Sequence, residues 1–151
     1  MAKQLVDSAI DRKNILNNSF AVSELQNQIG IKGVLFNGEY RFTTQQVADF
    51  YEVSVRTVRR YLSQFSEELR NSGYIDLENE ALDLWKQQFG GDMDVTTKLT
   101  RLGLFNFKAF LNIGFLLRES EKARILRGLV LNMVIHLVAK RAGGDTKFIN
   151  Q

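Results

Sequence analysis

Three arginines and a threonine recur at helical spacing in the segment VSVRTVRRYL, residues 53–62. Guanidinium groups bind phosphate or the guanine edge through paired hydrogen bonds, so Arg56, Arg59 and Arg60 carry nucleic-acid chemistry, with the hydroxyl of Thr57 beside them. A helix that buries Val58 turns these side chains outward. Because a helix fits the major groove of DNA, the pattern indicates a DNA-reading helix. A solvated basic face on an ordinary helix is the alternative.

Two helix start signals position this segment. Thr43 stands three residues before Gln46, which is the spacing of a capping box, and Ser54 follows a short break as the cap of a second helix. That second helix is predicted over residues 54–69, because apolar residues continue at helical spacing to Leu69. The start of the first helix is expected to hold a phosphate. The predicted DNA-binding residues are therefore Thr43, Thr44, Gln45, Ser54, Arg56, Thr57, Arg59 and Arg60.

Residues 45–62 resemble the helix-turn-helix of bacterial and phage regulators. The matching positions are a small residue in the first helix, two locking apolar residues and a cap, namely Ala48, Val53, Val58 and Ser54. One position departs from the pattern, since the turn residue is usually Gly and here it is Glu52. A left-handed backbone there costs a residue with a side chain about 1 kcal/mol, so we expect a wider turn.

A looser resemblance covers more of the chain. The hairpin signal Asn37-Gly38, the helix pair, a strand, LFNFKAFL at 104–111 and LLRESE at 116–121 look like the RhuM-type virulence-associated proteins. They are distantly similar to the amino-terminal domains of phage antirepressors of the Bro and KilA kind. The resemblance implies an α+β DNA-binding domain that is often followed by a variable carboxyl-terminal domain. A further segment is therefore expected beyond Gln151, after the Gly143-Gly144 linker.

Hydrophobic periodicity predicts one α+β domain over residues 1–151, mainly α-helical, with the helix-turn-helix at 43–69. A small antiparallel sheet combines the 33–42 hairpin with strands near Ile75 and at 96–104. Gly114 and Gly128 lie inside the last two predicted helices, where close helix packing is the expected reason for glycine. The remaining helices are expected at 4–17, 81–89, 107–118 and 120–141, with another that starts at Ser23 or Ser19 and ends at Gly30.

Composition narrows the class of protein further. The 151 residues include no Cys, which excludes disulfides and thiolate metal sites and makes a reduced, cytoplasmic setting the expectation. The amino terminus has no apolar run for a signal peptide, and Arg127 interrupts the most apolar stretch, so no membrane association is expected. Residues 98–151 carry ten basic against three acidic side chains, which favours contact with polyanions.

Other patterns that could carry chemistry are weak. His136 is the only histidine, and we expect it in the core or an interface; Asp92-Met93-Asp94 is too isolated for a metal site. No phosphate-binding or nucleophile motif occurs, so no catalytic residue, metal or cofactor is predicted, and the chain is not expected to be an enzyme. Phe105 and Phe107 are read as core and not as a base-stacking platform. A second cationic face consists of Lys122, Arg124 and Arg127. It is either exposed to solvent at the start of a helix or binds phosphate.

A lone helix-turn-helix contacts few bases, so a homodimer is expected. Its candidate surface is the apolar stripe Leu126, Leu129, Met133 and Leu137, with burial inside the monomer as the alternative. The main rival function is a protein-interaction adaptor, in which the helix pair binds a partner protein as an antirepressor binds a repressor. A third interpretation is the amino-terminal module of a larger enzyme whose chemistry lies beyond Gln151.

Overall fold

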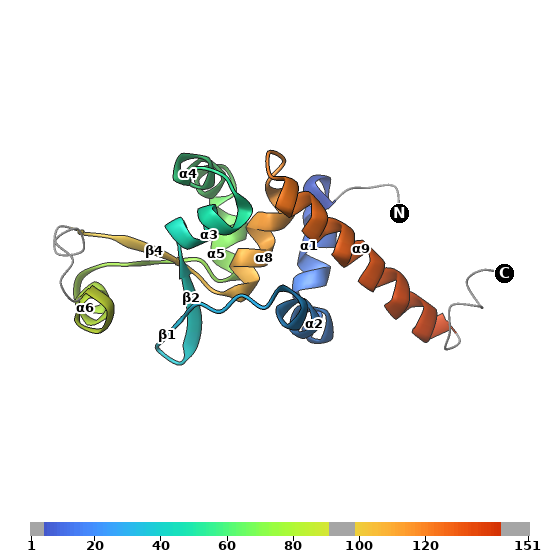
Figure 1. Ribbon diagram of the computed structural model, residues 1–151, viewed down its shortest axis with the longest axis horizontal. Coiled ribbons are helices and arrows are strands. Elements are labelled where there is room, and N and C mark those ends of the chain that lie inside the picture. The colour runs from blue at the N-terminus through green and yellow to red at the C-terminus, as the bar shows by residue number, and fades with distance from the viewer. Residues whose placement is uncertain (1–4, 91–98, 143–151) are drawn as a thin grey trace.

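An almost wholly apolar helix forms the centre of the molecule. In the computed structural model, which describes residues 5–90 and 99–142, α8 (Phe107–Leu116) has every side chain buried except that of Lys108. Asn106 begins this helix by accepting a hydrogen bond from the backbone of Ala109 at 2.8 Å. Helices from both sides of it in the sequence, and two strands of the sheet, contact α8 near the middle of the molecule (Figure 1). The predicted class, α+β and mainly helical with a small antiparallel sheet, is confirmed.

The amino-terminal segment packs on one side of α8. A 3₁₀ turn, η1 (Leu5–Asp7), leads into α1 (Ala9–Leu16) and then α2 (Ser19–Ile29). The side chain of Asn18 caps α2, and Gly30 ends it in the left-handed conformation at φ 72°. Leu16, Ala21 and Leu25 reach the core from these helices.

Four antiparallel strands form the sheet, in the order β1-β2-β4-β3. The hairpin of β1 (Val34–Phe36) and β2 (Glu39–Thr43) turns at Asn37 and Gly38, both with positive φ, as the Asn-Gly signal predicts. The strand β4 (Leu102–Phe105) lies between β2 and β3 (Ile75–Leu77). The predicted pairing with the strand near Ile75 is confirmed, but β4 starts at Leu102, and residues 96–98 lie outside the described residues.

A second, smaller core lies at the far end of the sheet. The helix α6 (Asn79–Trp85) and the π-helical turn η2 (Lys86–Gly90) lie away from the central helices (Figure 1). Trp85 packs edge-on against Phe36 of the hairpin, with ring centroids 5.3 Å apart. This cluster holds α6 to the strands through Phe36, Leu77, Leu82, Trp85 and Leu104.

The last helix, α9 (Glu121–Ala142), packs on α8 and then extends beyond the body of the molecule (Figure 1). Gly114 lies at this contact, because a Cβ there would overlap the Tyr51 hydroxyl and Leu126. Gly128 has nothing within 4 Å of the corresponding position, so the packing explanation is confirmed for the first glycine and wrong for the second. None of the helices in the described ranges is long and apolar enough to cross a membrane.

The apolar stripe predicted on α9 does not form one exposed surface. Leu126 and Met133 are buried against the monomer, Leu129 is 38% exposed, and the side chain of Leu137 lies outside the described part. The apolar side chains of α9 that are exposed to solvent are Leu129 of the predicted stripe and three residues outside it, Ile125, Leu131 and Ile135.

Candidate nucleic-acid interface

The helix pair begins with a complete capping box. Gln46 donates its backbone N–H to Thr43 Oγ1 at 3.1 Å, and the backbone N–H of Thr43 donates to Gln46 Oε1 at 2.8 Å. These bonds start α3 (Thr44–Tyr51) directly after β2, so the helix direction is fixed by the sheet. Thr43 and Thr44 are partly buried and Gln45 is exposed at this helix start.

Glu52 makes the turn between the two helices. Its backbone is left-handed, with φ 59° and ψ 45°, and its N–H bonds back to α3. The N–H of Val53 donates to the carbonyl of Ala48 at 3.0 Å, which closes the turn in three residues. The expected wider turn is therefore wrong: Glu52 accepts the strained conformation that glycine usually takes.

The second helix, α4 (Val55–Gln64), starts where it is predicted. Ser54 Oγ accepts the backbone N–H of Thr57 at 3.0 Å and lies 3.0 Å from the Thr57 hydroxyl, so both side chains serve the cap. Val58 and Tyr61 are buried beneath the helix, and Ala48 of α3 is buried opposite them. The helix pair is thus held by its apolar face and by two caps, as the sequence suggests.

The predicted extent of α4 is wrong at its end. The helix stops at Gln64, because Phe65 leaves the helical region with φ −116° and ψ 38°. A separate short helix, α5 (Ser66–Ser72), follows and keeps Leu69 buried. Phe65 stacks on Tyr61 at 6.0 Å, so its ring fills the bend. Residues 65–69 therefore continue the apolar spacing without belonging to the helix that carries the arginines.

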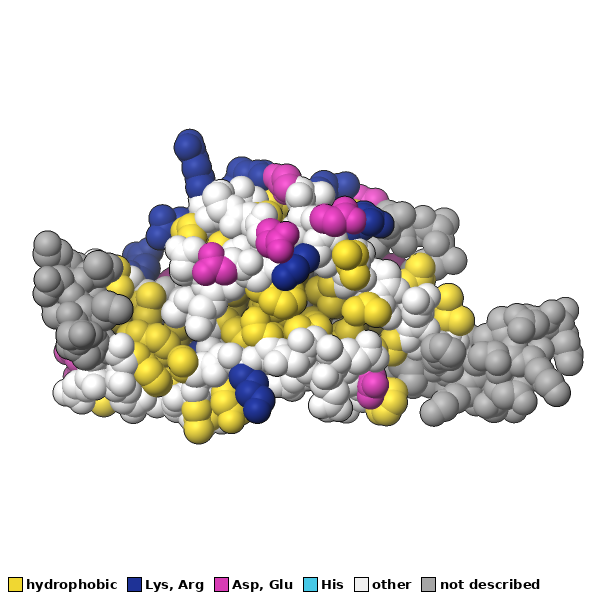
Figure 2. Space-filling model, in the orientation of Figure 1, with side chains coloured by type: hydrophobic (Ala, Val, Ile, Leu, Met, Phe, Trp, Pro, Cys, Tyr) yellow, Lys and Arg dark blue, Asp and Glu magenta, His cyan; other side chains and the backbone are white. Residues whose placement is uncertain are grey.

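The outward face of α4 presents two arginines that make no ion pair. Arg56 and Arg59 are exposed, and neither has an acidic partner among the residues that the structure describes. Lys and Arg side chains project from the edge of the molecule that carries α4 (Figure 2). Their guanidinium groups are thus available to an anionic partner.

Arg60 behaves differently from its neighbours. It forms an ion pair with Glu119 in the turn between α8 and α9, and its guanidinium lies 5.0 Å from the centroid of the Tyr61 ring. The Tyr61 hydroxyl donates to Glu119 at 2.6 Å. This hydrogen bond, together with Arg60, lowers the pKa of Glu119, while burial and the same carboxylate raise the pKa of Tyr61.

A groove of about 500 Å³, lined by both polar and apolar side chains, adjoins the arginine face of α4. It brings together the predicted residues Thr43, Thr44, Gln45 and Arg59, which come from α3 and α4. Two further arginines line it: Arg70 of α5, 2.7 Å from Asp76, and Arg101 just before β4, 3.8 Å from Glu78. The sequence prediction missed both. The only signal for Arg101 was its place in the basic carboxyl-terminal region.

The other candidates lie elsewhere or are engaged. Phe105 and Phe107 are buried, so the core interpretation of these rings is confirmed. Asp92-Met93-Asp94 and the side chain of His136 lie outside the described part of the chain. Within that part, no group of three or more acidic or histidine side chains is placed to hold a metal ion.

The second cationic face is also engaged in local contacts. Lys122 pairs with Glu52 at 3.6 Å, and Arg124 pairs with Glu121. Arg127 donates to the carbonyls of Gly114 and Leu117 at 2.9 Å each, where it satisfies the end of α8. Burial lowers the pKa of Arg127. These residues thus stabilise the start of α9 and the end of α8.

Comparison with known proteins adds no relative: no protein-family model, no curated protein and no solved structure matches the chain.

Proposed function

We propose that this chain is a double-stranded DNA-binding domain of a bacterial or phage-type regulator, with α4 as the recognition helix in the major groove. The observation that carries the proposal is the exposed pair Arg56 and Arg59, neither of which has an acidic partner in the described ranges. A helix that begins at the Ser54 cap and presents guanidinium groups without acidic partners in the described ranges suits both guanine and phosphate. Thr57, half-buried in the first turn of the same helix, has its hydroxyl 3.0 Å from Ser54 Oγ.

The groove beside α4 is proposed to receive the DNA backbone. Arg59 lies between the recognition face and the groove, and Arg101 adds a second cation from the sheet. Thr43, Thr44 and Gln45 offer a hydroxyl, an amide and the first-turn N–H groups of α3. Contacts of this kind position a protein on DNA without reading its sequence, so base readout is left to Arg56 and Thr57.

Arg60 and Ser54 take positioning roles in this proposal. Arg60 holds α4 to the turn that contains Glu119, and Ser54 caps the helix, so each orients the reading residues. The similarity of the sequence to RhuM-type proteins and to phage antirepressor domains supports a regulator of bacterial or phage genes. Such a protein would act in the cytoplasm, where that DNA is found.

The test is fluorescence anisotropy of a labelled random duplex at two salt concentrations. We expect Arg56→Ala with Arg59→Ala to weaken binding and to reduce the dependence of log K on log salt by about 1, because Arg59 is the proposed phosphate contact of the pair and each lost phosphate contact reduces that slope by about 1. The matched control is Lys32→Ala with Arg124→Ala, which removes the same charge from exposed positions elsewhere. This control is expected to retain most of the affinity.

The rival function is a protein-interaction adaptor, and the apolar face of α9 favours it. Ile125, Leu131 and Ile135 are each at least two-fifths exposed, which suits contact with another protein surface. An adaptor predicts no salt-dependent affinity for random duplexes. Absence of binding by the native chain, or equal binding by both double variants, rejects α4 as the DNA surface.

A further inference from the structure

A cleft of about 710 Å³ lies between α1 and α9, two helices that both pack on α8. One wall comes from η1 and α1, and the other comes from α9 (Figure 1). The apolar lining of this α1–α9 cleft consists of Leu5, Val6, Ile15, Val130, Leu131 and Val134. The cleft shares no lining residue with the groove beside α4. A ligand bound here would therefore leave the proposed DNA surface open.

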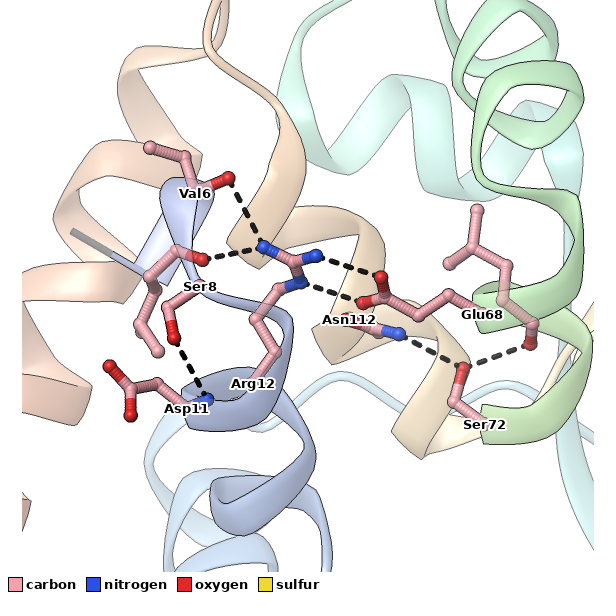
Figure 3. Close-up of polar contacts among 9 residues, drawn as sticks. Val6, Ser8, Asp11, Arg12, Glu68, Ser72 and Asn112 are labelled. Atoms are coloured by element: carbon pink, nitrogen blue, oxygen red, sulfur yellow. Dashed lines mark hydrogen bonds and ion pairs between the residues drawn. The ribbon is translucent and has the colours of Figure 1, made fainter. Parts of the chain in front are cut away.

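A buried arginine holds the wall that η1 contributes. Arg12 is 4% exposed and donates from Nε and Nη2 to the two carboxylate oxygens of Glu68 at 2.6 and 2.8 Å (Figure 3). Its Nη1 donates to the carbonyls of Leu5 and Val6 at 2.8 and 3.1 Å. Because one guanidinium makes all these hydrogen bonds, the backbone that presents Leu5 and Val6 to the cleft is fixed before any ligand binds.

The floor of the cleft on the α9 side is open at a glycine. Gly128 lines the cleft, and nothing lies within 4 Å of the position that its Cβ would take. Glycine in a helix interior costs about 1 kcal/mol relative to alanine, and no close packing within the described part of the chain accounts for it here. Glycine suits positions where another molecule approaches the backbone closely. The open floor at Gly128 therefore suits a ligand that lies against α9.

Beside this floor, a half-buried arginine offers one unused edge of its guanidinium. Arg127 donates from Nη1 to the carbonyls of Gly114 and Leu117 at 2.9 Å each, which fixes the group. Its Nε and Nη2 have no partner within the described part of the chain, and both atoms keep accessible surface. This is the edge with which Arg12 binds the carboxylate of Glu68. The geometry of Arg127 thus matches a carboxylate that enters from the cleft.

Two more arginines make this part of the cleft cationic. Arg118 and Arg124 also line it, and each forms an ion pair in solvent, where such pairs are weak. Burial lowers the pKa of Arg127, and the positive charges of Arg118 and Arg124 lower it further. Among the lining residues that the structure describes, Asp11 on the α1 wall supplies the only carboxylate. The charges around Arg127 therefore favour an anion.

Along α9, the cationic and apolar parts of the lining follow one another. The lining runs from Arg124 to Val134, which is about 15 Å of helix axis. Arg124 and Arg127 lie in the first part of this length, and Leu131 and Val134 lie in the last part. A linear ligand with an anionic head and an aliphatic tail matches this order. A volume of about 710 Å³ is also within the usual range of small-molecule sites, which are mostly apolar with a few polar groups.

We propose that the α1–α9 cleft binds a free medium-chain fatty acid. The carboxylate would accept hydrogen bonds from Nε and Nη2 of Arg127, and the aliphatic chain would lie over Gly128 against Leu131 and Val134. The proposal does not require DNA, so it stands or falls separately from the proposed function.

The experiment is isothermal titration of the full chain with octanoate, decanoate and dodecanoate, each below its critical micelle concentration. We expect saturable binding of one fatty acid per chain, tighter by about two- to fourfold for each added methylene group, as partial to full burial of that group gives. Decyltrimethylammonium has a ten-carbon tail and a positive head, and it is expected to bind at least tenfold more weakly than decanoate. Equal binding of these two compounds would show that the tail alone is recognised, and would overturn the proposal.

A variant at the floor tests whether the ligand occupies the cleft. Gly128→Leu places a side chain where the aliphatic chain would lie, so we expect decanoate binding to weaken by tenfold or more. The variant is expected to fold, because the glycine has no close neighbour to displace and leucine is the better helix former. The matched control, Asn27→Leu, adds the same side chain at an exposed position of α2 and should bind as the native chain does. Unchanged affinity in Gly128→Leu overturns the proposal.

A variant at the head group tests the bound carboxylate. Arg127→Lys keeps the positive charge but loses the edge formed by Nε and Nη2, so we expect at least tenfold weaker binding of decanoate. Arg127→Lys that folds and binds decanoate as the native chain does would contradict this role. If none of the three fatty acids binds the native chain and Gly128→Leu changes its oligomeric state, a second copy covers the cleft and the proposal is overturned. Absence of binding without such a change overturns it as well.

Discussion

The Tyr61 hydroxyl donates a 2.6 Å hydrogen bond to Glu119, 58 residues later in the chain, and accepts one from the backbone N–H of Arg118 at 3.2 Å. Tyr61 lies on the buried side of α4, and Glu119 lies in the turn between α8 and α9. The proposed recognition helix is therefore attached to the central helix by a side-chain contact that no short segment of sequence contains.

Replacement of Tyr61 should weaken the contact between α4 and the turn that joins α8 to α9. Tyr61→Phe removes both hydrogen bonds and leaves the N–H of Arg118 without its partner, so we expect the free energy of unfolding to fall by about 1–2 kcal/mol. Urea denaturation measures the change. The control is Tyr40→Phe on the exposed side of β2, expected to change stability by less than about 0.5 kcal/mol. Equal stability of both variants would show that the contact contributes nothing.

The same carboxylate should give the protein an acid-sensitive contact. Hydrogen bonding from Tyr61 and the charge of Arg60 lower the pKa of Glu119 below its usual 4.5. A lowered folded-state pKa contributes stability that is present above pH 4.5 and is lost as pH falls through the folded-state pKa. We expect the difference in unfolding free energy between native protein and Glu119→Gln to shrink below this pH. Urea titrations between neutral pH and pH 3 would reveal it, and a constant difference would contradict the assignment.

The turn of the helix pair holds removable strain. Glu52 has φ 59°, and its only ion pair in the described structure is an exposed one with Lys122 at 3.6 Å, worth about 0–1 kcal/mol. Glu52→Gly relieves the left-handed conformation, so we expect stability to rise by up to about 1 kcal/mol. Glu52→Gln is the control, because it removes the ion pair and keeps the strain. A glycine variant no more stable than the glutamine variant would refute the interpretation.

Local signals in the sequence were enough to predict the caps and the hairpin. The Thr43–Gln46 capping box and the Asn37-Gly38 turn depend on residues within four positions of each other, and both occur as predicted. Local signals did not predict the end of α4, because the same apolar spacing is compatible with two different structures. The spacing from Val55 to Leu69 is the same for one helix or for two helices bent at Phe65.

The sequence allowed prediction only of those site residues that lie close together in the chain, within one helix. Arg56 and Arg59 follow from helical spacing around Val58, whereas the pairing of Arg60 depends on Glu119 from a distant turn. Arg101 reaches the groove because β4 returns beside β2, a pairing that helical and strand periodicity cannot specify. Contacts between residues far apart in the sequence decide which arginine side chains form ion pairs. Helical and strand periodicity does not predict such contacts.

The exposed apolar face of α9 predicts self-association. Ile135 is 47% exposed and Ile125 54% exposed, and a two-fold dimer would bury such residues against their own copies. We expect light scattering to give a dimer mass at tens of micromolar, and Ile125→Asp with Ile135→Asp to give a monomer. The control Glu121→Asp keeps the charge at an exposed position of the same helix. A monomeric mass for the native chain at this concentration would contradict the predicted dimer.

Two glycines in adjoining helices should respond to alanine in opposite ways. Gly114 of α8 faces the buried Tyr51 hydroxyl, which donates to the carbonyl of Phe110 at 2.8 Å, and an added methyl group would displace that ring. Such overpacking costs about 1–3 kcal/mol, so Gly114→Ala should lower the free energy of unfolding. Gly128 of α9 faces open space, and alanine there should raise helix stability by about 1 kcal/mol.

Thermal or urea unfolding of the two variants measures the contrast directly. The pair is its own control, because both changes add one methyl group to a helix interior and differ only in what that group meets. Changes of the same sign would mean that α9 does not pack on α8 as described. Opposite signs would locate the close approach of the two helices at Gly114, where Tyr51 connects the end of α3 to the central helix.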